Sequence, residues 1–130
     1  MFFTAWGAYS DLGREEEAFE AFLRGLTYFE GEGPSPDSLR AVFRREGHEA
    51  AIQAYLDGST PEPGEWFGRA GMELFVGETD AALASAERAV DEREHYAPWV
   101  LTLGLGPDGA VLRENPRFHA LVRRIGLEVP

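Results

Sequence analysis

The chain of 130 residues contains no cysteine and no lysine, and its only side-chain amides are those of Gln53 and Asn115. Without cysteine it can form no disulfide, thiol nucleophile or cysteine-ligated zinc or iron–sulfur site. No apolar run approaches the roughly 18 residues that span a bilayer, and the first residues lack the basic segment of a signal peptide. These absences predict a soluble, cytoplasmic protein that does not act at a membrane.

Positive charge is also scarce, because 12 arginines stand against 23 acidic residues and the net charge is −11. A nucleic-acid footprint needs clustered positive charge, so this composition disfavours nucleic-acid binding by the domain itself. The length fits a single domain, which can bury a core without disulfides or a structural metal. The sequence therefore predicts one acidic globular domain.

Three segments share one pattern, in which a helical stretch, a glycine and an Ala-rich helical stretch follow one another. The glycines are Gly13, Gly47 and Gly77, so successive segments are 34 and 30 residues apart. Glycine suits the left-handed position that ends a helix, which predicts three pairs of antiparallel helices. Five and nine positions after each glycine stand apolar residues on one helix face: Ala18 and Phe22, Ile52 and Leu56, and Ala82 and Ala86.

Helix-start signals agree with this division. Ser35-Pro36 and Asn115-Pro116 each place a capping residue before a proline at the first helical position. Residues 100–112 allow either a short β-hairpin closed by a Pro-Asp-Gly turn or an ordered loop. Helices over about 70% of the chain predict an all-α class, with the ranges 2–11, 14–29, 36–46, 48–57, 63–76, 79–95 and 116–125.

The repeated segments resemble tetratricopeptide repeats (TPRs), whose unit is a 34-residue helix–turn–helix. The resemblance is carried by Ala8, Tyr9, Gly13, Ala18 and Phe22, by Phe43 and Gly47, and by Trp66, Ala70, Gly77, Ala82, Ala86 and Ala89. It implies an α-solenoid of three degenerate hairpins within a single domain. The units would be about residues 1–33, 34–61 and 62–95, followed by a connector at 96–115 and a capping helix at 116–127.

The last stretch, residues 112–127, resembles the closing segment that follows TPR arrays in bacterial signalling proteins, including winged-helix transcription regulators, nucleotide cyclases and Ser/Thr kinases. A repeat array needs a final helix with one apolar face and one polar face. Here an apolar stripe on one side of the helix and arginines on the other side meet this need. The stripe consists of Phe118, Leu121, Val122 and Ile125. This resemblance implies a sensory or scaffolding C-terminal part of a bacterial regulator.

The TPR register also implies a partner-binding groove on the inner surface of the array. The groove-facing positions would be Phe3, Gly7, Ser10, Asp11, Ala41, Arg44, Arg45, Phe67, Gly71 and Leu74. A peptide with apolar anchors and an acidic flank would suit them, with Phe67 and Leu74 as anchors and the two arginines as charge partners. The alternative is a self-associating module that uses an exposed N-terminal edge formed by Phe2, Phe3 and Trp6.

Other motifs favour structural interpretations. Gly104-x-Gly106-x-x-Gly109 matches the dinucleotide fingerprint only formally, because Pro107 interrupts it and no βαβ unit surrounds it, so a turn is expected. The histidines lack the partners of a metal site: Glu92 and His95 have no second Glu-x-x-His, and His48 and His119 have no ligand at metal-binding spacing. No cofactor or metal is predicted.

Catalytic groups are also not indicated by the sequence. The five serines lie in turns, near caps or on an Ala-rich helix, and none occupies a nucleophile elbow. The carboxylates are expected on solvated helix faces or in first turns, as for Glu15 to Glu17, Glu20, Glu87 and Glu94. A non-catalytic interaction module is predicted, and a small acid/base enzyme is the less favoured alternative.

Overall fold

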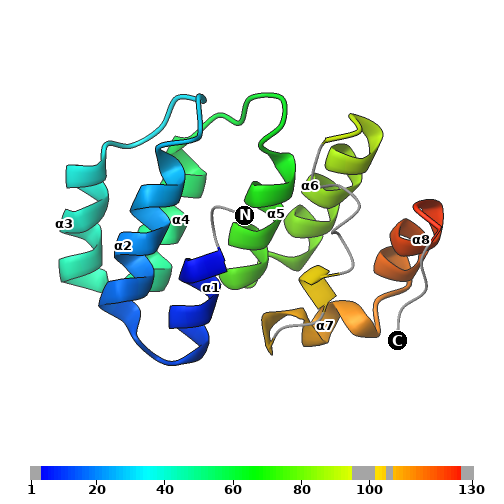
Figure 1. The fold of residues 1–130 in the computed structure, drawn as a ribbon, viewed down its shortest axis with the longest axis horizontal. Helices are drawn as coiled ribbons and strands as arrows, with labels where there is room; N and C mark the ends of the chain where they lie inside the picture. The colour runs from blue at the N-terminus through cyan, green and yellow to red at the C-terminus, as the bar shows by residue number, and fades with distance from the viewer. Residues whose placement is uncertain (1–3, 95–101, 105–106, 127–130) are drawn as a thin grey trace. The chain divides into compact units, whose positions relative to one another are not determined.

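The computed structural model describes residues 4–94, 102–104 and 107–126 (Figure 1). Over these residues the protein is 73% helical, with eight α-helices, short 3₁₀ turns and no strand, which confirms the all-α class. Contacts divide the chain into two compact units, Met1–Glu62 and Pro63–Pro130. No helix in the described ranges has the length and apolar character needed to cross a membrane.

The first compact unit consists of two helical hairpins. Within each hairpin the helices pack against each other, and α2 also contacts α4 (Figure 1). The hairpins are α1 (Thr4–Asp11) with α2 (Glu15–Leu26), and α3 (Pro36–Glu46) with α4 (His48–Gly58). Helix α2 was expected to reach residue 29, but its end tightens into 3₁₀-type turns, in which Tyr28 N–H donates to the Gly25 carbonyl at 3.2 Å.

The predicted glycines make the turns inside these hairpins. Gly13 has φ of 72°, and the following Arg14 N–H donates to the Tyr9 carbonyl at 2.9 Å, which closes the end of α1. Gly47, with φ of 96°, both ends α3 and begins α4. A side chain at either position would be strained, so the sequence pattern follows from backbone conformation.

The core of the first compact unit lies along the repeat positions. Ala18 and Ile52 are completely buried, as the apolar spacing predicts. Phe22, from the same face of α2 as Ala18, has its ring centroid 5.5 Å from that of Trp6 on α1 and 5.9 Å from that of Tyr55 on α4. A small side chain next to large rings lets the helices approach closely and fill the space between them.

The second compact unit contains a third hairpin and a closing helix. Its elements are α5 (Trp66–Phe75), α6 (Thr79–Asp91), the 3₁₀ turn η2 (Pro107–Gly109), α7 (Ala110–Arg113) and α8 (Pro116–Arg124). Helices α5 and α6 pack together, and α8 contacts both α6 and α7. Gly77 between α5 and α6 has φ of 84°, as predicted, and Ala82 is buried.

Helix α8 presents the predicted apolar stripe to the core. Phe118, Leu121 and Val122 are buried, and Phe118 and Val122 share one cluster with Leu83 and Leu112. The Asn115 side chain caps the helix by accepting from the Arg117 N–H at 2.9 Å. On the polar side, α8 forms two ion pairs with α6, Arg117 with Glu87 and Arg124 with Asp91.

For the segment 100–112 the sequence allowed either a β-hairpin or an ordered loop, and the described residues of this segment distinguish the two. Residues 102–104 and Pro107–Gly109 form 3₁₀ turns and α7 follows, so the described part of this segment is helical and the β-hairpin interpretation is wrong there. Close packing explains two glycines of the motif. A Cβ on Gly109 would lie 2.1 Å from the Leu103 carbonyl oxygen, and one on Gly104 would lie 2.9 Å from the Phe118 ring.

Glu94 departs from its expected role on a solvated face. It is buried, and its carboxylate accepts from the backbone N–H groups of Gly64 at 3.1 Å, Trp66 at 3.0 Å and Phe67 at 3.0 Å. This contact caps α5, whose own N-cap residue, Glu65, makes no capping hydrogen bond with its side chain, and α5 begins at Trp66 rather than at residue 63. Helix α6 ends at Asp91 rather than at 95, and Arg93 takes a positive φ of 54°.

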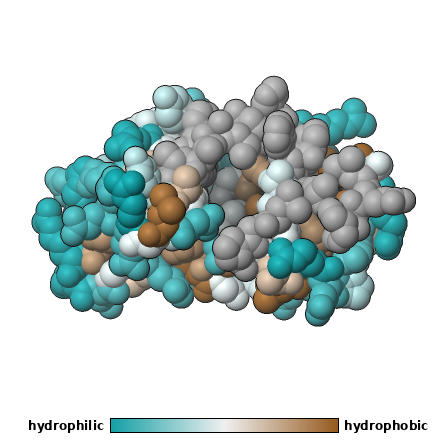
Figure 2. Space-filling view, turned by 60° about the horizontal axis from the view of Figure 1, so that its bottom comes forward, coloured by the Kyte–Doolittle hydropathy of each residue, from teal (hydrophilic) through white to brown (hydrophobic). Residues whose placement is uncertain are grey.

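Exposed hydrophobic side chains are scattered on the described surface. Leu12 is 68% exposed, Tyr28 63% and Val111 56%. In Figure 2, hydrophobic residues appear as small spots among hydrophilic ones on the described part of the face in view. Isolated exposed apolar residues are normal on protein surfaces and do not by themselves mark an interface.

We expect the Glu94→Gln substitution to lower the free energy of unfolding by about 1–3 kcal/mol, because three N–H donors in partly buried hydrogen bonds would lose a charged acceptor. Urea denaturation followed by far-UV circular dichroism measures this change. Glu92→Gln is the matched control, since Glu92 is exposed and its ion pair with Arg88 is worth less than about 1 kcal/mol. Equal stability of the two variants would contradict the capping role.

Candidate functional site

The α3 helix carries three arginines on a chain of strongly acidic composition. Arg40 and Arg44 are four residues apart and therefore lie on one side of the helix, and Arg45 adjoins them. Arg44 and Arg45 are in the last turn, where the helix dipole favours cations. We call Arg40, Arg44 and Arg45 the basic surface of α3.

One of these arginines, Arg40, forms ion pairs with acidic side chains. The Arg40 Nε lies 3.4 Å from Glu20 Oε1 on α2, and its Nη1 lies 3.4 Å from Asp37 Oδ1. The hydrogen bond to Glu20 raises the pKa of Arg40 above its ordinary value, so this residue stays charged. Arg44 and Arg45 are exposed, and neither forms a hydrogen bond or ion pair with any residue that the structure describes. Two cations therefore remain available to a ligand.

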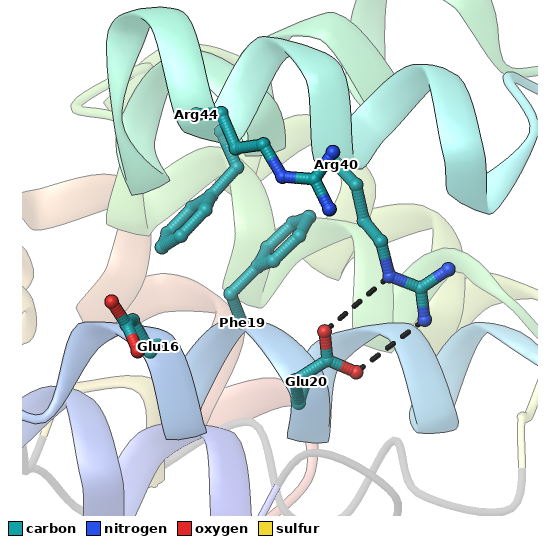
Figure 3. A pocket seen from close by; sticks show the side chains of 6 residues that line it. Glu16, Phe19, Glu20, Arg40 and Arg44 are labelled. Carbon is teal, nitrogen blue, oxygen red and sulfur yellow. Dashed lines mark hydrogen bonds and ion pairs between the residues drawn. The ribbon is translucent and has the colours of Figure 1, made fainter.

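A half-open pocket of about 280 Å³ lies between α2 and α3 in the first compact unit. Its lining residues are Glu16, Phe19, Glu20, Arg40, Phe43 and Arg44. Figure 3 shows Glu16 and Glu20 on the α2 side, facing Arg40 and Arg44 on the α3 side. The pocket thus combines charges of both signs with aromatic carbon.

Two stacked rings form the floor of this pocket. The Phe19 and Phe43 centroids are 4.4 Å apart and their planes differ by 2°. Phe19 is 1% exposed, whereas Phe43 is only half-buried and offers the accessible apolar surface. An apolar side chain of a ligand would therefore contact Phe43, with Arg44 next to it in the chain.

The floor rings also contact a buried histidine. The His48 ring centroid lies 6.2 Å from that of Phe19 and 6.3 Å from that of Phe43, edge to face in both cases. The Trp6 Nε1–H donates to His48 Nε2 at 3.0 Å, which links α1 to α4. Burial lowers the pKa of His48 below its ordinary value. His48 is thus a buried, hydrogen-bonded core residue.

The predicted groove residues of the first compact unit have mixed surroundings. Gly7, Ser10 and Ala41 are half-buried, and Asp11 is exposed at the end of α1. Arg44 and Arg45 are exposed as expected, and Arg44 lines the α2–α3 pocket. Phe3 and Phe2 lie outside the described residues. Trp6, proposed for an exposed edge, is 7% exposed and hydrogen-bonded inside the unit, so that part of the self-association hypothesis is wrong.

The predicted groove residues of the second compact unit belong largely to its core. Leu74 is 7% exposed and packs with Leu83 and Phe118, so it is not available as an apolar anchor. Phe67 is partly buried against Ala70 and Ala86, and Gly71 is half-buried. The register argument failed for Leu74 because α7 and α8 cover this side of α5 and α6, which the repeat pattern does not encode.

Sequence reasoning also missed several pocket residues. Glu16 and Glu20 were expected on a solvated face, and Phe19, Phe43 and Arg40 were not assigned to a site. The signal that was present was the four-residue spacing of Arg40 and Arg44. The pairing of α2 with α3 residues could not be found in this way, because it depends on how the two hairpins pack.

A buried carboxyl group in the second compact unit is relevant to the acid/base alternative. Glu73 is 6% exposed, and the Ser85 hydroxyl donates to its carboxylate across α5 and α6. Burial raises the pKa of Glu73, although Ser85 and Arg69 oppose the shift. Within the described ranges, no group of three or more His, Asp or Glu side chains could hold a metal ion.

We expect Glu73→Gln to stabilise the protein at neutral pH. A raised pKa in the folded state means that stability falls as the pH rises from about 4.5, because the unfolded state releases its proton first. The variant removes this pH-dependent loss of stability, and its side-chain amide oxygen can still accept from the Ser85 hydroxyl. Thermal unfolding between about pH 4 and pH 8 measures the difference.

Ser85→Ala should have the opposite effect. It removes the hydroxyl that donates to the Glu73 carboxylate, so it should lower the stability of the protein at neutral pH. If Glu73→Gln lowered stability at neutral pH and the pH profile kept its wild-type slope, the assignment of a destabilised buried carboxylate would be wrong.

Comparison with known proteins finds no match among family models, curated proteins or solved structures. A function for this chain therefore has to be inferred from its own residues. We infer one from the α2–α3 pocket and from Arg44 and Arg45, which have no partner among the residues that the structure describes.

Proposed function

We propose that the chain is a non-catalytic protein-interaction module of three TPR-like hairpins and a capping helix, serving as the sensory or scaffolding C-terminal part of a bacterial regulator. Its binding surface is the basic surface of α3 together with the α2–α3 pocket. The observation that carries this proposal is the pair of exposed arginines, Arg44 and Arg45, without partners among the described residues. The regulator setting rests on the resemblance of residues 112–127 alone.

The hairpins support the TPR-like part of the proposal. Each of α1–α2, α3–α4 and α5–α6 turns at a glycine with positive φ. The residue five positions after each glycine is buried, with Ala18 and Ile52 at 0% exposure and Ala82 at 1%. These are the positions at which repeat hairpins pack their two helices together.

The chemistry of the pocket indicates the kind of partner. Arg44 and Arg45 would pair with carboxylates, and Phe43 would contact an apolar side chain between them. The acidic balance of the rest of the chain repels such a peptide at long range. That repulsion is screened beyond about 8 Å at physiological ionic strength, so pairing at the basic surface decides binding.

Phe43 takes the anchoring role that the sequence predicted for Leu74. Leu74 is enclosed by the core, whereas Phe43 is half-buried and lines the pocket beside Arg44. The partner is accordingly a segment in which one apolar residue is flanked by acidic ones. A short contact of this kind predicts weak, transient binding rather than a permanent complex.

We expect Arg44→Glu with Arg45→Glu to weaken binding of such a segment at least about tenfold, or 1.4 kcal/mol, because two attractions become repulsions. The probe is a fluorescent peptide with one leucine flanked by glutamates, and fluorescence anisotropy with the full chain measures the affinity. The same peptide with lysines in place of glutamates should bind more weakly.

The matched control is Arg93→Glu with Arg123→Glu, which changes the net charge equally. Both residues are exposed, lie in the second compact unit and have no side-chain partner among the described residues. Circular dichroism of both double variants checks that helicity is retained. Equal loss of binding in both variants would show a general charge effect, and unchanged binding in the α3 variant would refute the proposed surface.

A further inference from the structure

The Trp6–His48 hydrogen bond links two helices that are far apart in the sequence. The two residues are 42 positions apart, and their side chains are 7% and 5% exposed. An indole nitrogen can only donate, so His48 Nε2 must accept and therefore carries no proton. The neutral imidazole holds its proton on Nδ1, and this tautomer is required by the bond.

The surroundings of His48 disfavour its charged form. Ring centroids of Trp6, Phe19 and Phe43 lie 6.2, 6.2 and 6.3 Å away. His48 is also the first residue of α4, where the positive end of the helix dipole opposes a cation. Desolvation accordingly lowers the pKa of His48, and the Glu15 carboxylate on α2 opposes this shift only in part. The rings of Trp6 on α1 and of Phe43 on α3 also face His48, and both are uncharged.

Protonation would break the bond rather than weaken it. A proton on Nε2 turns the acceptor into a donor, which then faces the indole N–H. The imidazolium would also be buried against the rings of Trp6, Phe19 and Phe43, and burial disfavours a charge. The protein relieves this by moving Trp6 or His48 towards water.

Trp6 attaches α1 to this core. Helix α1 has only eight residues, and among its side chains whose burial the structure describes, those of residues 6–11, that of Trp6 is the buried one. The Trp6 ring also packs on Phe22, whose centroid is 5.5 Å away. Helices this short are not stable alone in water, so α1 depends on its packing against the rest of the unit, to which Trp6 contributes.

We propose that the Trp6–His48 bond is a proton-operated latch, which holds α1 and the Phe19–Phe43 floor of the α2–α3 pocket in place and releases both on acidification. The floor is included because both of its rings contact the imidazole that the latch fixes. Its effect on ligand binding rests on the proposed function. The latch itself does not, because it is defined by the bond within the first compact unit.

The first test follows the Trp6 indole N–H by ¹H–¹⁵N NMR in the full chain, with Trp6→Phe to assign the signal. Between about pH 8 and pH 5 the wild-type signal should shift and its protection from solvent exchange should fall. In His48→Gln the amide oxygen can still accept, and the pH dependence of this signal should disappear. His119→Gln, at a half-buried histidine of the second compact unit, should keep it.

Imidazole ¹⁵N shifts of the wild-type protein supply a measurement that needs no variant. His48 should be the Nδ1–H tautomer at about pH 8 and should titrate below the ordinary histidine value of about 6.5. An Nε2–H tautomer, titration above that value, or the same indole profile in His48→Gln and wild type would overturn the latch.

The second test measures binding of the glutamate-flanked leucine peptide at about pH 7.5 and pH 5.5, where its glutamates stay largely ionised. The wild-type affinity should fall at least about fivefold, the lower end of typical coupling between two sites, and that of His48→Gln should stay constant. No binding at either pH refutes the proposed function and leaves the NMR test to decide on the latch. Binding that is independent of pH, with a normal NMR titration, refutes the link to the pocket.

Discussion

Each hairpin buries a small or branched side chain between its two helices, and the other packing contacts follow from this close approach. Ala18, Ile52 and Ala82 have almost no exposed surface. Close helix approach at these positions brings the large rings of the first compact unit together and lets α8 close the core of the second. The pocket exists because α2 and α3 are held by hairpins packed in this way.

Among the described residues, three contacts that involve buried polar side chains each lie inside one compact unit. They are Trp6 with His48, Glu73 with Ser85, and Glu94 with the start of α5. The first two respond to pH in opposite directions. Stability from neutral His48 is lost as the pH falls below about 6.5, and stability from protonated Glu73 is lost as it rises above about 4.5. Each compact unit therefore has its own pH response.

The arginines show how a strongly acidic chain can still present a basic surface. Several of them are committed to ion pairs that join helices, such as Arg40 with Glu20 and Arg117 with Glu87. Others are placed at helix ends, where the dipole favours them without a partner. Arg44 and Arg45 belong to this second group, so their position serves the stability of α3 and leaves their charge available to a ligand.

Local signals in the sequence were enough to predict α1 to α6 and α8, their glycine turns and the buried repeat positions, although not the exact helix ends, because these features follow from spacing and backbone conformation within a few residues. The same local signals place Arg44 and Arg45 on the surface in the last turn of a helix, and their role in binding stays a prediction. Tertiary packing places Leu74 in the core, lets Glu94 cap α5, makes residues 102–104 and 107–113 helical, and joins Trp6 to His48. These outcomes depend on contacts between residues as many as 42 positions apart, and no local pattern encodes which distant group will fill a cavity or satisfy a buried donor.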